Sequence, residues 1–400
     1  MFKHKFGPTR IRPVTSPTSS KSLKSSYKCV HSISSTDNVS PATPESKKPK
    51  YVSSNIATDT HNVVSPDQNR LHIFQELIYA PVCKMELLRE ISWNGVPNKL
   101  RSIVWALLLN YLPSDSSRRE QTRITKMKEY EIHTSRYTSS RLKSTSPHDV
   151  SLVHQIKVDL PRTTTDLPFV QHPRINLMLT RVLLLWAVRH PAAGYVQGMN
   201  DLAIPLLIAI LTPKVSQSEP SDFTMDGLEE EEFMQIESDL YYLFEKFLDP
   251  LECFYINNQN GFNNMVLLFD MVLAKCNETS ALHDHFTSIG VHSNLFAFRW
   301  MSCLLFRELP HSLVLRMIDT YLADGNFVHF HIFVCVAILR HFVSDLIDMD
   351  FASTLMFLQD LKQQTKTWPT RLLEDIFSFA FVLQSQYGDA VQQRKASLSV

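Results

Sequence analysis

Residues 176–211 read NLMLTRVLLLWAVRHPAAGYVQGMNDLAIPLLIAIL, and this stretch decides the fold class. The runs 176–190 and 201–211 are apolar on nearly every face of a helix, which is typical of helices buried in a large core. The longest apolar stretch in the chain, residues 202–211, includes Pro205 and is too short to span a bilayer. The stretch therefore predicts two buried core helices joined by a short loop, and no transmembrane segment.

The low glycine content of the chain favours an all-α fold. The 400 residues are 44 % hydrophobic but include only 9 glycines, where average usage would give roughly 28. Sheets with many tight hairpins need glycine in their turns. No two glycines are spaced two or five residues apart, which excludes the GxGxxG fingerprint and the GxxxxGK phosphate loop. We therefore expect no nucleotide cofactor held by the chain itself.

Outside the two core helices, apolar residues also recur with a helical period. The segments that show this period are 72–79, 86–91, 100–112, 150–158, 233–248, 265–275, 296–307, 312–321, 330–347, 351–362 and 371–386. Residues 114–149 are polar and mostly basic, which predicts a surface helix and a loop. Residues 214–232 carry seven acidic residues and one lysine, which predicts an exposed loop.

The first 66 residues differ in composition from the rest of the chain. Residues 1–70 hold 11 Lys and Arg against 4 Asp and Glu, and residues 1–66 hold 21 Ser and Thr and 7 Pro. Such a segment cannot bury enough apolar surface to offset the entropy of ordering it. We therefore expect a disordered basic tail over 1–66, a folded domain over 67–390 and a loose tail over 391–400. A basic tail can contact an anionic membrane, and a solvated linker is the alternative interpretation.

Several other function classes find little support in the sequence. The six cysteines form no CxxC pair and no HExxH motif occurs, so we expect no metal site and a reducing, cytoplasmic compartment. The basic stretch 118–143 has few interleaved aromatic residues, Tyr130 and Tyr137, so we expect no nucleic-acid partner.

The segment Ile156-Lys157-Val158-Asp159-Leu160-Pro161-Arg162-Thr163 is a candidate functional site. Pro161 ends the preceding helix and biases Leu160 toward an extended conformation, so Arg162 emerges on a loop directly after a rigid element. Its planar guanidinium suits phosphate oxygens, and Asp159 lies three residues earlier, where it could hold that guanidinium. An ordinary ion-paired surface arginine is the alternative interpretation.

The segment Gly194-Tyr195-Val196-Gln197-Gly198-Met199-Asn200-Asp201 is the second candidate. Two glycines followed by Asn and Asp predict a tight turn that leads into a helix N-terminus. The side chain of Gln197 can both donate and accept hydrogen bonds, so it can orient a water molecule. A helix-capping turn without chemistry is the alternative interpretation.

Together the two segments resemble the signature motifs of the TBC domain, the catalytic domain of Rab GTPase-activating proteins. The motifs are Ile156-x-x-Asp159-x-x-Arg162 and Tyr195-x-Gln197-Gly198-Met199. Further matches follow the family's order: Trp93-Asn94-Gly95-Val96-Pro97, Arg101-x-x-x-Trp105, Phe296-Ala297-Phe298-Arg299-Trp300, Phe306 and Asp319. The resemblance covers residues 70–390. Segments 186–192, 195–202 and 330–335 are most similar to the branch of TBC domain family member 22, which is associated with the Golgi.

The resemblance implies a two-lobed, multi-helix domain, and we place the division of its lobes near residues 249–255. It implies an arginine finger at Arg162 and a glutamine finger at Gln197, which act in trans on a GTP-loaded Rab. Asp159, Tyr195 and Gly198 would support the two fingers. Trp93, Arg101, Trp105, Trp300 and Asp319 would be structural. GTP and magnesium would be carried by the partner, so the chain would be a GTPase activator, not itself a hydrolase.

Two features leave alternatives open. The family has Trp before the Asp of its third block, where this chain has Ile318, so the local packing of the C-terminal lobe could differ. A TBC domain can also act only as a Rab-binding scaffold, and a helical adaptor unrelated to GTPases remains if the motif set is coincidental.

The resemblance implies a role in vesicle trafficking at the Golgi.

Overall fold

The structure is a computed structural model that describes residues 66–164 and 166–398, and the predicted basic tail lies outside this range except for Pro66. The described chain is helical and has no strand, only an isolated bridge between Val82 and Asp115. This confirms the all-α prediction. Among the described residues, none of the helices combines the length and the apolar composition that a membrane-spanning helix needs.

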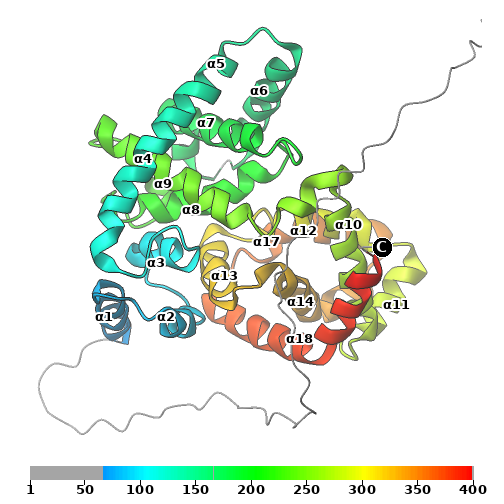
Figure 1. The fold of residues 1–400 in the computed structure, drawn as a ribbon. Helices are drawn as coiled ribbons and strands as arrows, with labels where there is room; N and C mark the ends of the chain where they lie inside the picture. Colours follow the sequence, from blue (N-terminus) through cyan, green and yellow to red (C-terminus); the bar gives the residue numbers. More distant parts are fainter. Residues whose placement is uncertain (1–65, 165, 399–400) are drawn as a thin grey trace, which may run out of the picture. The chain divides into compact units, whose positions relative to one another are not determined.

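The first part of the chain forms α1 to α9 (Figure 1). These helices are α1 (Pro66–Tyr79), α2 (Met85–Ser92), α3 (Arg101–Leu108), α4 (Arg119–His133), α5 (Ser139–Leu142), α6 (Pro147–Asp159), α7 (Pro173–Arg189), α8 (Met199–Leu211) and α9 (Glu230–Leu248). All residues of α8 are buried, as its uniformly apolar sequence predicts. It packs against α9, α7 and α3, and α4 also packs against α9.

The second part of the chain forms α10 to α18. These helices are α10 (Glu252–Lys275), α11 (Ser280–Ile289), α12 (Ala297–Ser302), α13 (His311–Asp324), α14 (Phe327–His341), α15 (Val343–Leu346), α16 (Phe351–Gln359), α17 (Leu361–Gln364) and α18 (Thr370–Leu398). The central helix is α14, which is buried from Phe327 to Leu339. It packs against α18, α10 and α13.

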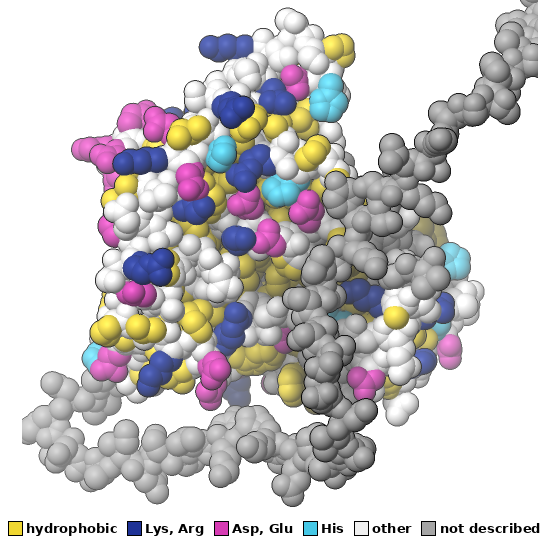
Figure 2. All heavy atoms as spheres, in the orientation of Figure 1, with side chains coloured by type: hydrophobic (Ala, Val, Ile, Leu, Met, Phe, Trp, Pro, Cys, Tyr) yellow, Lys and Arg dark blue, Asp and Glu magenta, His cyan; other side chains and the backbone are white. Residues whose placement is uncertain are grey.

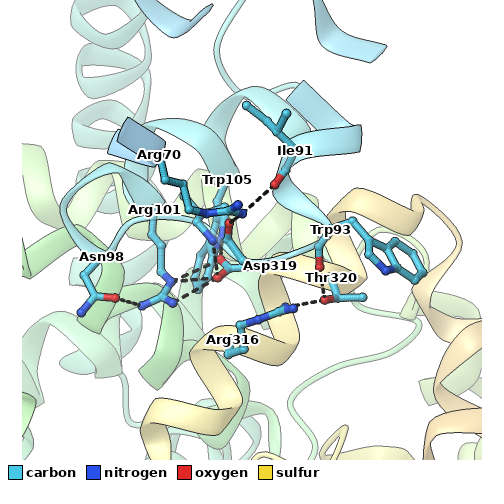
Figure 3. Close-up of polar contacts among 11 residues, drawn as sticks. Arg70, Ile91, Trp93, Asn98, Arg101, Trp105, Arg316, Asp319 and Thr320 are labelled. Carbon is cyan, nitrogen blue, oxygen red and sulfur yellow. Dashed lines mark hydrogen bonds and ion pairs between the residues drawn. The ribbon is translucent and has the colours of Figure 1, made fainter. Parts of the chain in front are cut away.

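Helix α13 connects the two groups of helices, because it packs against α2, α3 and α8 of the first group as well as α14 of the second. The contact centres on Asp319, whose carboxylate is fully buried (Figure 3). Its two oxygens accept hydrogen bonds from the Val96 backbone N–H at 2.9 Å and from Trp105 Nε1 at 2.8 Å. Arg101 Nη2 pairs with it at 3.1 Å. Two neutral donors and a cation thus compensate one buried charge.

A second set of contacts fastens the loop after α2 to the same region (Figure 3). Arg70 donates to the Ile91 carbonyl at 2.8 Å and also to the Gly95 carbonyl. The Thr320 hydroxyl donates to the Trp93 carbonyl at 2.8 Å. The segment that contains the predicted motif 93–97 is therefore held from both α1 and α13.

Several predicted helix limits are wrong. Helix α10 begins thirteen residues before the predicted start at 265, and α11 was not predicted at all. The helix predicted over 296–307 ends at Ser302, because Leu304 and Leu305 adopt left-handed backbone conformations with φ of 49° and 62°. The predicted tail 391–400 is helical as far as Leu398, as the end of α18.

The loop predicted over 214–232 is only partly a loop. Helix α9 already begins at Glu230, and Glu229 and Glu232 form a capping box at its start. Acidic side chains are favourable there because they face the positive end of the helix dipole. Phe223 and Met225 are buried, and the Phe223 ring lies 5.5 Å from that of Phe169. The middle of this segment is therefore anchored to the core.

Replacement of Asp319 by Ala should lower the free energy of unfolding by about 3–5 kcal/mol, because it leaves the buried Arg101 without its counter-charge. Urea denaturation followed by circular dichroism measures this. Glu278→Ala is the control, since Glu278 pairs with Arg340 where both side chains are 48 % exposed, and such a pair contributes about 0–1 kcal/mol. Equal losses in the two variants would contradict this account of Asp319.

Candidate functional site

Arg162 lies at the end of a 3₁₀ turn, Leu160–Arg162, that directly follows α6. Leu160 has φ −56° and ψ −45°, so the turn continues the helical path of α6. The prediction that Pro161 makes Leu160 extended is therefore wrong. Leu160 is fully buried, and this packing overrides the steric bias. The Arg162 side chain is exposed and forms no hydrogen bond or ion pair with any described residue.

Gln197 lies on the short loop between α7 and α8. The loop is closed by backbone hydrogen bonds from Gly194 N to the His190 carbonyl at 2.8 Å and from Met199 N to the Val196 carbonyl at 3.1 Å. The Gln197 side chain is exposed. The loop thus fixes the backbone of Gln197 while its amide faces solvent.

Gly198 sets the path of the chain from this loop into α8. Its φ is +105°, in the left-handed region that favours glycine, and it is the N-cap of α8. A Cβ atom at this position would lie 2.8 Å from the Sγ of Cys303. Backbone conformation and close packing therefore both require glycine directly after Gln197.

A closed set of hydrogen bonds joins the segments that carry Arg162 and Gln197. The Tyr195 hydroxyl lies 2.9 Å from Asp159 Oδ2 and 3.1 Å from Asn200 Oδ1. Asn200 Oδ1 also accepts from Gly198 N at 3.0 Å, and Asn200 Nδ2 donates to Thr163 Oγ1 at 2.8 Å. Thr163 Oγ1 in turn donates to the Asp159 carbonyl at 3.1 Å. We call these side chains and the Gly198 amide the Asn200 network.

The Asp159 carboxylate accepts a hydrogen bond from Tyr195. The structure therefore does not show the predicted contact between Asp159 and the Arg162 guanidinium. Asp159 instead fixes the backbone just before Arg162, through its contact with Tyr195. Burial raises the pKa of the Tyr195 hydroxyl, and the Asp159 carboxylate raises it further. Tyr195 therefore keeps its proton and remains a hydrogen-bond donor at neutral pH.

A pocket of about 170 Å³ lies beside Arg162. It is lined by Arg162, Thr163, Thr164, Asp166, Asp201, Ile204, Pro205, Phe306, Arg307, His311 and Lys362. Burial raises the pKa of Asp201 to about 7, although Arg307 Nε lies 3.8 Å from its carboxylate and opposes that shift. Among the described residues, no three His, Cys, Asp or Glu side chains are grouped as a metal site requires.

Comparison with known proteins identifies the family. The model of the Rab-GTPase-TBC domain matches residues 98–347. The chain belongs to this family. It is 37 % identical over 324 residues to the GTPase-activating protein gyp1 of Schizosaccharomyces pombe and 34 % identical over 326 residues to TBC1 domain family member 22B of Homo sapiens. The similarity to the branch of family member 22 is thereby confirmed.

The alignments cover 80 % and 81 % of this chain but only 62 % and 63 % of these two relatives. Among solved structures, the crystal structure of the Ypt/Rab-GAP domain of Gyp1p is similar with a TM-score of 0.73 and 35 % sequence identity. That likeness covers 80 % of this chain and 99 % of the other. The TBC fold therefore accounts for most of the described residues.

The structure brings the predicted site residues, apart from Trp300, together in two groups. Asp159, Arg162, Tyr195, Gln197 and Gly198 lie on the two joined segments described above. Trp93, Arg101, Trp105 and Asp319 lie in or beside the buried cluster of Figure 3. Trp300 is fully buried and its carbonyl accepts a hydrogen bond from His331 Nε2 at 2.9 Å. Ile318 is also fully buried, so an apolar side chain fills the position of the family's Trp.

The sequence indicates Asn200 only as part of the turn before α8, and it indicates no role for Thr163. The Asn200 side chain accepts from the N–H of Gly198, two residues before it, whereas an Asx turn accepts from an N–H two residues after the side chain. The usual turn pattern therefore does not predict this contact. The partner across the site, Thr163, is 37 residues away in the sequence, and no local pattern indicates it.

We expect Gly198→Ala to cost more stability than Gly194→Ala, although both glycines have positive φ. A Cβ at Gly194 meets nothing within 4 Å, so only the left-handed strain of about 1–2 kcal/mol applies there. At Gly198 the contact with Cys303 adds to the strain. Urea denaturation of both variants measures the difference, and a Cys303→Ala background should reduce it. Equal losses would contradict the packing argument.

Proposed function

We propose that this chain is a GTPase-activating protein for one or more Rab proteins. The observation that carries the proposal is the pairing of two exposed polar side chains, Arg162 and Gln197, on backbone segments joined by the Asn200 network. Arg162 would neutralise charge that develops on the phosphates of GTP, and Gln197 would orient the attacking water. GTP and Mg²⁺ belong to the partner, so the chain acts in trans and does not hydrolyse GTP itself.

The proposed role of Arg162 requires a transition-state stabilisation that a single arginine can supply. An arginine finger supplied in trans is worth roughly 10³–10⁵ in rate, or about 4–7 kcal/mol of transition-state stabilisation. Such a group must be charged, exposed and fixed at its base. Arg162 meets these requirements, because its guanidinium has no internal partner among the described residues and its backbone is held by Thr163 and Asp159.

The names of the relatives support this proposal, since one is called a GTPase-activating protein and a similar solved structure is called a Ypt/Rab-GAP domain. We extend the proposal to a cytoplasmic protein that associates with the Golgi and regulates vesicle trafficking. The proposed TBC domain spans 67–390. The short link between Leu248 and Glu252 supports a lobe division near 249–255, although α2 and α3 pack across it onto α13.

The test is phosphate release from a panel of GTP-loaded Rab proteins in the presence of the full chain. We expect the wild type to accelerate at least one Rab, and Arg162→Ala and Gln197→Ala to lose most of that acceleration, by about 10³ for the arginine. Arg162→Lys keeps the charge but loses the planar fork, so it should recover little. Arg371→Ala, at an exposed arginine of α18, is the control.

Rab binding by the wild type without any acceleration would favour the catalytically silent scaffold instead. Absence of both binding and acceleration across the panel would favour a helical adaptor unrelated to GTPases. Full activity of Arg162→Ala would contradict the role of the arginine.

A further inference from the structure

Thr164 and Asp166, which come soon after Arg162 in the sequence, make contacts outside the Asn200 network. Thr164 is buried, and its hydroxyl donates to Asp166 Oδ1. Further along, Phe169 and Val170 are buried in the 3₁₀ turn Pro168–Gln171. Asp166 itself is half-exposed, so its carboxylate can meet groups from other elements.

Asp166 contacts two helices from the second half of the chain. Lys362 Nζ, on α17, donates to Asp166 Oδ2 at 2.9 Å. His311 Nε2, at the first residue of α13, lies 3.3 Å from the same oxygen and 3.3 Å from the Thr164 hydroxyl. His311 and Lys362 line the same pocket as Asp166, and their helices α13 and α17 lie close together in Figure 1. The carboxylate thus joins the Arg162 segment to α13 and α17.

At neutral pH, the charges indicate an ion pair between Asp166 and Lys362. Burial alone would raise the pKa of Asp166, but the hydrogen bonds from Thr164 and Lys362 outweigh it and hold the pKa well below its usual range. Burial lowers the pKa of His311, so its imidazole is largely neutral. Lys362 is then the cation that faces Asp166. An ion pair this exposed adds little to global stability, so any importance it has is local.

The pocket beside Arg162 does not have the charge of a free anion site. Among its described lining residues, Lys362 faces Asp166 and Arg307 faces Asp201. Of the basic side chains that line the pocket in the described part of the chain, only Arg162 has no acidic partner. Acidic and basic side chains are likewise interspersed on the face shown in Figure 2. The pocket therefore serves better as a frame around Arg162 than as a binding site for a separate phosphate.

We propose that Asp166 and Lys362 form a clamp that orients Arg162 from its C-terminal side. This inference rests on the proposed Rab-activating function and deepens it by naming two positioning residues. The Asn200 network holds both Arg162 and Gln197 segments, whereas the clamp contacts only the Arg162 segment. Loss of the clamp leaves partner binding unchanged and misorients one reacting group.

The experiment measures kcat and KM for GTP hydrolysis by a responsive Rab with the full chain. Asp166→Asn and Lys362→Met should each lower kcat by roughly 10–100-fold, the order of loss for a small misplacement of a catalytic group, with KM within about twofold. In an Arg162→Ala background, Asp166→Asn should cause no further loss, because its effect passes through the arginine. The exchanged pair Asp166→Lys with Lys362→Asp should recover part of kcat.

Glu278→Gln, at the exposed pair with Arg340, is the matched control and should change neither constant. A full additional loss from Asp166→Asn in the Arg162→Ala background would overturn the proposal, as would a raised KM with unchanged kcat, which would place Asp166 in the partner interface. Unchanged kcat in Asp166→Asn would also overturn it.

A second readout separates failure of the clamp from failure of the proposed function. If the wild type accelerates no Rab, the proposed function fails, and amide hydrogen exchange of the free protein still tests the clamp. Faster exchange over 160–164 in Asp166→Asn than in wild type supports the clamp. Unchanged exchange overturns it.

Discussion

The hydrogen bond from the Asn200 amide to the Thr163 hydroxyl is the contact on which the site depends. It joins two segments that are remote in sequence, and each of them presents one exposed polar side chain. Asn200, Tyr195 and Asp159 are all buried, so their hydrogen bonds form in a low-dielectric environment where a lost partner is costly. Buried hydrogen bonds therefore hold the backbones that carry two exposed side chains, Arg162 and Gln197, to which the proposal assigns the action on a partner.

The packing around these segments explains why they stay in place. Helix α8, which begins directly after Gly198, is buried throughout, and Gly198 lies against Cys303 near the end of α12. Helix α13 connects the remaining parts, because its first residue contacts Asp166 and its Asp319 binds the segment after α2. Burial of apolar helices thus stabilises the fold, and a few buried polar contacts fix the positions of the segments that connect these helices.

The sequence predicts the core helices well because they are nearly uniformly apolar. It fails where polar residues occur inside a helix, as in the INNQNGFNN run of α10, which hides the start of that helix. Helix α11 is short and buries only Leu282 and Phe286, too few residues for a clear period. The left-handed conformations at Leu304 and Leu305 follow from tertiary packing, since leucine itself favours a right-handed helix.

The candidate site likewise has features that the sequence predicts and features that it does not. The exposed position of Gln197 follows from a loop that the sequence indicates through Gly198. Arg162 is exposed as predicted, but at the end of a 3₁₀ turn and not on the extended loop that Pro161 indicates. The partners that fix these segments are not predicted, because Thr163 and Asp166 receive contacts from residues 37 and 196 positions away. Local patterns therefore indicate the candidate side chains, and only the folded chain shows which residues hold their backbones.

A double-mutant cycle between Thr163→Val and Asn200→Ala tests this account most directly. Each variant removes one side of the central hydrogen bond, and urea denaturation gives the free energy of unfolding for both single variants and the double variant. The account predicts a coupling energy of about 1 kcal/mol, within the range for residues in direct contact. Losses that add to within about 0.3 kcal/mol, as for independent sites, would contradict it.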